Sequence, residues 1–181
     1  PPGHVAQAVA AGPFDFDHLG AEVGEVAGAV GAGDHRRQVE DAHVGFDRAV
    51  EGIPPDLRGV RPAGFEHSAW QLLEHIRIAQ DDILDFCINT QYAHSMTWPD
   101  DYWPTATAPT DEAAWTDSIA GYARSRSGLK KLVRDVEDFT ARVPSGNAEQ
   151  TYLRASLLTA DHTAYHVGQL IAIRRALGTW G

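Results

Sequence analysis

Asp161-His-Thr-Ala-Tyr-His-Val-Gly-Gln-Leu-Ile-Ala-Ile-Arg-Arg175 is the stretch that decides the fold of this chain. Three charged residues and one glycine recur every seven positions in this stretch and just before it: Arg154, Asp161, Gly168 and Arg175. This spacing predicts that they lie on the solvent side of one long helix. Measured from Asp161, at about 100° per residue, His162 and His166 lie roughly 100° and 140° round the helix, beside its apolar side. The two imidazoles are therefore expected to point inward and to share one face.

Three more segments have the same helical spacing. The four predicted helices are residues 34–51, with Asp34 as N-cap; 66–87; 111–139, capped by Thr110; and 148–177, closed by Gly178. Apolar residues on the third recur at three- and four-residue steps: Trp115, Ile119, Tyr122, Leu129, Val133 and Val136. No segment alternates apolar and polar residues with a period of two, so we expect no sheet. The prediction is an all-α four-helix bundle.

The connection between the second and third helices, residues 88–109, is too long for an ordinary helical hairpin. Its centre, Trp98-Pro-Asp-Asp-Tyr-Trp-Pro104, is rigid and aromatic, unlike a flexible linker. One interpretation is a packed crossover that plugs one end of the bundle. The other is that the same aromatic residues also wall a ligand pocket, and the two interpretations are compatible.

Composition limits the function classes. The 181 residues are 43% hydrophobic and carry a net charge of −10, which disfavours nucleic acid and anionic membranes as partners. A single cysteine, Cys87, excludes an intramolecular disulfide and the cysteine-rich zinc modules. No apolar run approaches the length of a membrane span, and no signal peptide is recognisable, so we expect a cytoplasmic protein.

The first 33 residues differ from the rest. They hold seven of the 17 glycines and almost no aromatic residues, which is poor material for a packed helix. We expect residues 1–33 to be a poorly structured or non-native extension and residues 34–181 to be the domain.

The inward histidines of the last helix need partners. Burying a neutral imidazole without a partner costs on the order of 1–3 kcal/mol for each unpaired group. Hydrogen bonds to core hydroxyls or carboxylates satisfy this requirement, and so does a metal ion. Zinc proteases carry a Glu after the first His, and here that position is Thr163, so their chemistry is not supported.

A third nitrogen ligand is available on the second helix. An apolar stripe runs along one side of it: Leu72, Ile76, Ala79, Ile83 and Phe86. The outer side is predicted to carry Glu74, Arg77 and Asp81. His75 lies at the edge of the stripe and can lean inward. His67, on the predicted solvent side, His94, in the crossover, and His43, on the first helix, are weaker candidates.

Three neutral imidazoles from two helices leave open positions on an ion, which is typical of a catalytic rather than a structural site. Imidazole suits Zn²⁺, Ni²⁺, Cu²⁺ or Fe²⁺, so the residues do not choose the metal. Such an ion lowers the pKa of bound water or of an exogenous thiol.

The segments 67–80 and 162–175, with their Glu-His and His-x3-His-x-Gly-Gln patterns, resemble the DinB family of DinB/YfiT-like metalloenzymes. The loop 98–104 resembles an uncharacterised branch of that family. The resemblance covers about residues 42–178 and does not extend upstream of Ala42.

The resemblance implies a homodimeric, up-down-down-up four-helix bundle with a long crossover between helices 2 and 3. It also implies a divalent metal on three histidines, which fall on His75, His162 and His166. Characterised relatives include thiol S-transferases that use bacillithiol or mycothiol and a hydrolase. The leading hypothesis is therefore that the ion, Zn, Ni or Fe, activates a low-molecular-weight thiol or water for attack on an electrophilic small molecule. The candidate pocket walls are Tyr92, Trp98, Tyr102 and Trp103.

Two alternatives remain open at this point. The first is a noncatalytic metal-binding helical module of a stress or damage response, and the second is a bundle whose inward histidines are only hydrogen-bonded.

Overall fold

Helix α3 (Ala69–Ile88) packs against both other long helices, α4 (Glu112–Asp135) and α5 (Tyr152–Ala176). The structure is a computed structural model that describes residues 45–181. Within these residues the regular elements are the three long helices, a helical segment at 45–50, and the short 3-10 helices η1 (Pro55–Leu57) and η2 (Asp100–Tyr102). An isolated bridge between Arg142 and Thr151 forms no strand. The predicted all-α fold class is confirmed, whereas residues 1–33 and the predicted N-cap Asp34 lie outside the described part.

A capping box starts α3. The Ser68 side chain accepts a hydrogen bond from the Gln71 backbone N–H, and the Gln71 side chain accepts one from the Ser68 N–H. Together these bonds satisfy two of the N–H groups that a helix start leaves without partners. The helix therefore begins at Ala69, three residues later than predicted.

Helices α4 and α5 are both shorter than predicted where they adjoin the connection 136–151. Helix α4 ends at Asp135 rather than near residue 139, and α5 begins at Tyr152 rather than near residue 148. At its other end, α4 is capped by Asp111 rather than Thr110. In the connection, Asp138 accepts from the Thr140 N–H, and Asn147 accepts from the Glu149 N–H. Such side-chain turns compete with helical hydrogen bonds and stop the helix.

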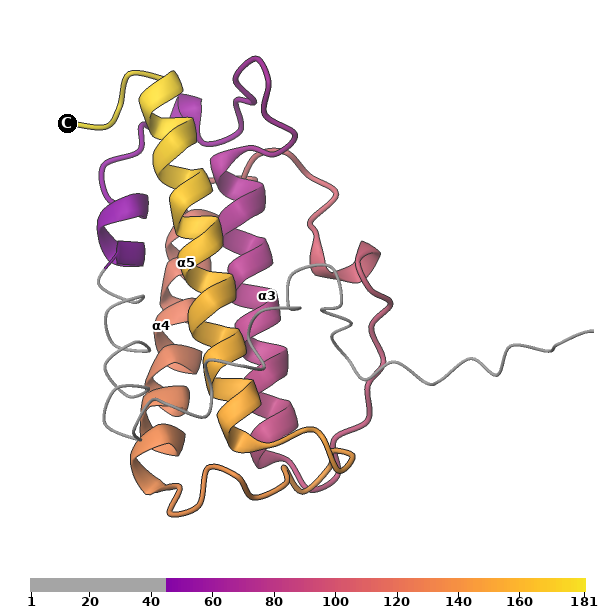
Figure 1. Cartoon of the computed structure of the whole chain (residues 1–181). Helices are drawn as coiled ribbons and strands as arrows, with labels where there is room; N and C mark the ends of the chain where they lie inside the picture. The colour runs from indigo at the N-terminus through magenta and orange to yellow at the C-terminus, as the bar shows by residue number, and fades with distance from the viewer. Residues whose placement is uncertain (1–44) are drawn as a thin grey trace, which may run out of the picture.

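Figure 1 shows that α3 and α4 run in the same direction and that α5 runs in the opposite one. The predicted long crossover is present: residues 89–111 return along the outside of the bundle from the end of α3 to the start of α4. It carries η2, whose Tyr102 side chain is fully buried.

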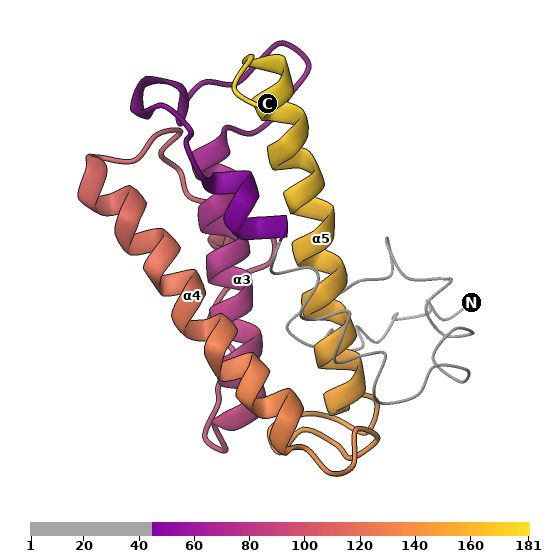
Figure 2. The ribbon, with the colours of Figure 1, turned by 90° about the vertical axis from the view of Figure 1, so that its left-hand side faces the viewer.

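Residues 45–50 lie between α4 and α5, as Figure 2 shows. The ring of Phe46 stacks on that of Tyr122 in α4, with centroids 3.6 Å apart. On the other side, the guanidinium of Arg174 in α5 donates to the carbonyl oxygens of Arg48, at 2.8 Å, and Ala49, at 3.1 Å. These are carbonyls that the end of a helix leaves unpaired. The short segment thus joins the two helices that flank α3.

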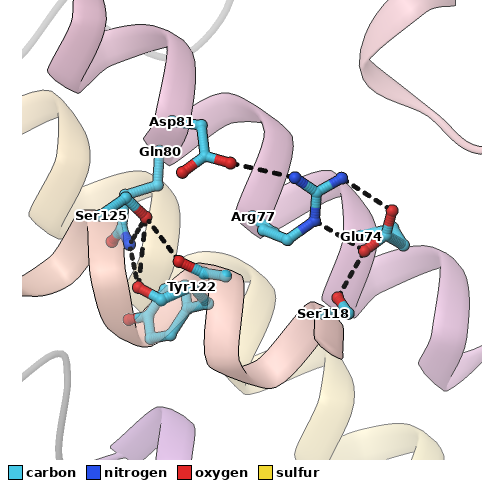
Figure 3. Close-up of polar contacts among 8 residues, drawn as sticks. Glu74, Arg77, Gln80, Asp81, Ser118, Tyr122 and Ser125 are labelled. Atoms are coloured by element: carbon cyan, nitrogen blue, oxygen red, sulfur yellow. Dashed lines mark hydrogen bonds and ion pairs between the residues drawn. The ribbon is translucent and has the colours of Figure 1, made fainter. Parts of the chain in front are cut away.

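Polar residues connect α3 to α4 on the side away from the histidines. Arg77 donates to both Glu74 and Asp81, and Ser118 in α4 donates to Glu74 (Figure 3). The Glu74 side chain is 14% exposed, so its predicted outward position is wrong. Burial raises the pKa of the Glu74 carboxyl, but the hydrogen bonds from Arg77 and Ser118 outweigh it and lower the pKa. The cluster borders a groove of about 560 Å³ between the two helices.

No helix within residues 45–181 is long and apolar enough to cross a membrane.

Candidate metal centre

Three histidines from two helices meet at the interface of α3 and α5. Their candidate ligand nitrogens all lie within 4.8 Å of one another, and the residues are His75, His162 and His166. The ring centroids are 4.5 to 4.8 Å apart, and the side chains are buried, with 1%, 7% and 7% exposure in that order. The marker positions of the heptad pattern in α5, Arg154, Asp161, Gly168 and Arg175, are all exposed, which explains why His162 and His166 point inward.

Hydrogen bonds fix the orientation of two of these rings. His75 Nδ1 lies 2.9 Å from the backbone oxygen of Tyr102 in the crossover. His166 Nδ1 lies 2.7 Å from Oε1 of Gln169, one turn further along α5. Both oxygens can only accept, so each Nδ1 carries the hydrogen and each Nε2 keeps its lone pair. Holding an imidazole in this tautomer is the usual task of groups behind a metal ligand.

The rings are neutral at neutral pH. Burial, with a smaller contribution from His166, lowers the pKa of His75 to about 3, although the Tyr102 carbonyl raises it. Burial lowers the pKa of His166 to about 4, and it lowers the pKa of His162 well below its ordinary value. A histidine must be neutral to bind a metal ion. Each of the three rings is already neutral and therefore offers one lone pair without first losing a proton.

Nε2 of His162 lies 2.9 Å from Nε2 of His75. Since His75 Nε2 keeps its lone pair, His162 must donate a hydrogen to it when no cation is present. A cation would instead bind the lone pairs of both Nε2 atoms, with the hydrogen of His162 moved to its Nδ1. Nitrogens about 2.0–2.1 Å from a tetrahedral Zn²⁺ are roughly 3.4 Å apart, so the spacing of the three ring nitrogens fits such an ion after small rotations.

A cavity of about 1010 Å³ opens beside the histidines, and all three line it. Trp103 from the crossover stacks on His75, with centroids 3.8 Å apart and 2° between the planes. Trp98, from the same loop, also lines the cavity and is 37% exposed. The crossover thus covers α3 and supplies aromatic walls next to the histidines.

The other two candidate wall residues lie elsewhere. Tyr102 and Tyr92 donate their hydroxyl hydrogens to the two oxygens of the buried Asp82, at 2.6 Å and 2.8 Å, and neither is among the residues that line the cavity. They hold the crossover against α3. His94 lies beside the Tyr92 hydroxyl and is exposed, away from the cluster. His43 lies outside the described residues.

Sequence reasoning misplaced one residue of the cavity, His67. His67 was placed on the solvent side, but it precedes the first turn of α3, so the helical wheel does not apply to it. Its ring stacks on Trp103 at a centroid distance of 3.8 Å, which puts Trp103 between two imidazoles. Tyr165 and Gln169 in α5 also line the cavity. Each lies three residues after a candidate ligand, Tyr165 after His162 and Gln169 after His166, and this helical spacing was the available signal.

The fold and the site define an all-helical protein with a buried cluster of three histidines that is compatible with metal binding. The family model of the DinB superfamily matches residues 38–170, and the chain belongs to this superfamily. Comparison with curated proteins and with solved structures finds no match to the chain.

Proposed function

We propose that the protein is a metal-dependent enzyme that joins a thiol or water to an electrophilic small molecule. The observation that carries the proposal is the convergence of three neutral histidine nitrogens at the wall of a cavity of about 1010 Å³. A structural site would surround its ion with protein ligands, whereas three ligands beside a cavity leave room for an exogenous one.

The residues of the chain have separate tasks in this proposal. His75, His162 and His166 hold the ion through their ring nitrogens, while the Tyr102 carbonyl and Gln169 keep two of the rings in the required tautomer. A bound Zn, Ni or Fe ion would lower the pKa of a thiol or of water and so supply a nucleophile near neutral pH. Trp98 and Trp103 exclude water from one side of the cavity and offer flat apolar surfaces to the electrophile.

The size of the cavity suits two small reactants together. Pockets for single small molecules measure about 300–1,000 Å³, and this cavity is at the upper end of that range. A low-molecular-weight thiol such as mycothiol or bacillithiol is our proposal for the co-substrate of a transferase.

We also propose the overall topology, the domain bounds, the oligomeric state and the location of the protein. These are an up-down-down-up topology completed by the first helix, a domain formed by residues 34–181 with residues 1–33 as an extension, a homodimer, and a cytoplasmic location.

Metal analysis of the purified protein tests the proposal. About one divalent ion per chain is expected for the unaltered protein, and His166→Ala and His75→Ala should each remove most of it. The matched control is His94→Ala, which removes an exposed histidine outside the cluster and should leave the metal content unchanged. Metal content that is negligible, or equal in all four proteins, would show that the histidines are only hydrogen-bonded.

A second assay separates the reaction types. The metal-loaded protein is incubated with a model electrophile, with and without a low-molecular-weight thiol, and both reactants are followed. Consumption of thiol and electrophile together identifies a transferase, and loss of the electrophile without thiol identifies a hydrolase. A metal-loaded protein that does neither with a panel of electrophiles supports the noncatalytic metal-binding module of a stress response.

A further inference from the structure

Tyr165 stands at the edge of the cavity, next to a candidate metal ligand. Its ring centroid lies 4.9 Å from that of His166, and the side chain lines the cavity while remaining 52% exposed. Among the described residues that line the cavity, it is the one that carries a hydroxyl group. The metal-binding proposal assigns this hydroxyl no task.

A chain of hydrogen bonds with a fixed direction ends at Tyr165. His166 Nδ1 donates to Oε1 of Gln169, 2.7 Å away. Nε2 of Gln169 then faces the Tyr165 oxygen at 3.3 Å. An amide nitrogen can only donate, so the Tyr165 oxygen is the acceptor in this bond. The hydroxyl hydrogen is consequently directed away from Gln169.

We propose that the Tyr165 hydroxyl donates a hydrogen bond to an oxygen atom of the ligand bound beside the three histidines, and that Gln169 positions it for this task. The inference rests on the proposed metal site. It narrows the substrate class to electrophiles that carry an oxygen acceptor, such as a carbonyl or nitro group, next to the atom that reacts. Charge that develops on such an oxygen during attack would be stabilised by the hydroxyl.

The chemistry of the other lining residues agrees with this assignment. Trp98, Trp103 and Phe65 offer ring surfaces, and both ends of the Gln169 amide are already engaged. Pockets of this kind use a few placed polar groups to orient a ligand among apolar walls. Tyr165 is the side chain in the described lining that offers a hydroxyl donor beside His166, and it can do so without giving up a bond to the cluster.

The test uses the protein loaded with Co²⁺, whose visible absorption reports on ligands of the ion. Two probes are titrated: acetohydroxamic acid, which has oxygen acceptors, and ethanethiol, whose single acceptor is the sulfur that would bind the ion. Tyr165→Phe keeps the ring and removes the hydroxyl from a half-exposed position, so the fold and the Co²⁺ content should not change. The hydroxamate should bind about 2- to 13-fold more weakly, the range for one neutral hydrogen bond, while ethanethiol binding is unchanged.

Gln169→Glu provides the second variant. The new carboxylate can still accept from His166 Nδ1, but its other oxygen would accept the Tyr165 hydrogen and turn it away from the cavity. The added negative charge weakens both probes, so the ratio of their affinities isolates the hydroxyl. The affinity for the hydroxamate relative to that for ethanethiol should fall as it does in Tyr165→Phe. The variant that carries both Tyr165→Phe and Gln169→Glu should show no further fall.

The outcomes are distinguishable. An unchanged ratio in Tyr165→Phe, or equal weakening of both probes, overturns the role of Tyr165 while the metal site stands. A fall in the ratio for Tyr165→Phe but not for Gln169→Glu overturns the positioning role of Gln169. Failure of the unaltered protein to take up Co²⁺ overturns the proposed function, and this inference with it.

Discussion

Asp82→Ala is expected to be among the most damaging single substitutions outside the three histidines. Asp82 is 9% exposed and accepts hydrogen bonds from Tyr102, at 2.6 Å, and Tyr92, at 2.8 Å, which together hold the crossover on α3. Burial, and then the Asp82 carboxylate itself, raise the pKa of Tyr102, so its hydroxyl stays protonated and acts as the donor.

The magnitude follows from the two bonds. A hydrogen bond to a charged group contributes about 1.5–3 kcal/mol, so the loss of both sets an upper range of about 3–6 kcal/mol. Tyr92 is only partly buried, and water can replace its partner. Tyr102 is 0% exposed, so its hydroxyl loses a charged acceptor at a place where bulk water does not take over. We therefore expect a loss of about 3–4 kcal/mol, with Tyr102→Phe at about 2 and Tyr92→Phe at about 1 kcal/mol.

Urea unfolding of the metal-free proteins measures these differences. Asp85→Ala is the matched control, because Asp85 is an exposed carboxylate on the same helix and should change stability by less than about 0.5 kcal/mol. The backbone oxygen of Tyr102 also holds His75, so Asp82→Ala should weaken metal binding by about 10- to 100-fold, as loss of support behind a ligand does. A stability loss below about 1 kcal/mol would refute the reasoning.

Two further predictions concern glycines and pH. Gly59→Ala would bring a Cβ within 2.4 Å of the Ala108 Cβ and force the crossover outward, so we expect a loss of stability. The added Cβ of Gly168→Ala meets nothing within 4 Å in an exposed helical position, so this substitution should stabilise the protein by about 0.5–1 kcal/mol. Urea midpoints of both variants check the pair, and a result of equal sign contradicts it. Since the pKa of His75 is lowered to about 3 and that of His166 to about 4 from 6.5, the unfolded chain binds protons that the folded metal-free protein does not. Stability should therefore fall as the pH drops from 6.5 towards 4, by up to about 1.4 kcal/mol per pH unit for each histidine, and unfolding midpoints that do not change between pH 7 and pH 5 would contradict this.

The features that depend on helical period could be predicted from the sequence. The heptad of exposed residues in α5 places His162 and His166 inward, and the apolar stripe of α3 places His75 beside them, so the cluster follows from two local patterns. The same method failed where the chain leaves the helix. His67 precedes α3, and its position in the cavity depends on its stacking with Trp103, a residue of the crossover.

Helix ends and interface polarity were harder to predict. Ser68 and Gln71 form a capping box that is recognisable in the sequence, and such a box marks Ala69 as the first residue of α3. Glu74 is different, because a charged residue on a helical wheel is assigned to solvent unless the neighbouring helix is known. Its burial depends on Ser118, in a helix whose position against α3 is set by tertiary packing.

The bridging position of residues 45–50 has a consequence for the order in which the chain folds. Asp47 pairs with Arg126, 79 residues away, and the Arg48 carbonyl accepts from Arg174, 126 residues away. During synthesis these early residues leave the ribosome long before either partner exists, with the side chain of Phe46 exposed to water. Contacts of such separation form late, because the chain between them must first be ordered. Helix α5 therefore docks residues 45–50 only after about 120 further residues have been made. A chain truncated before Arg174 would present an unburied apolar segment to chaperones and proteases.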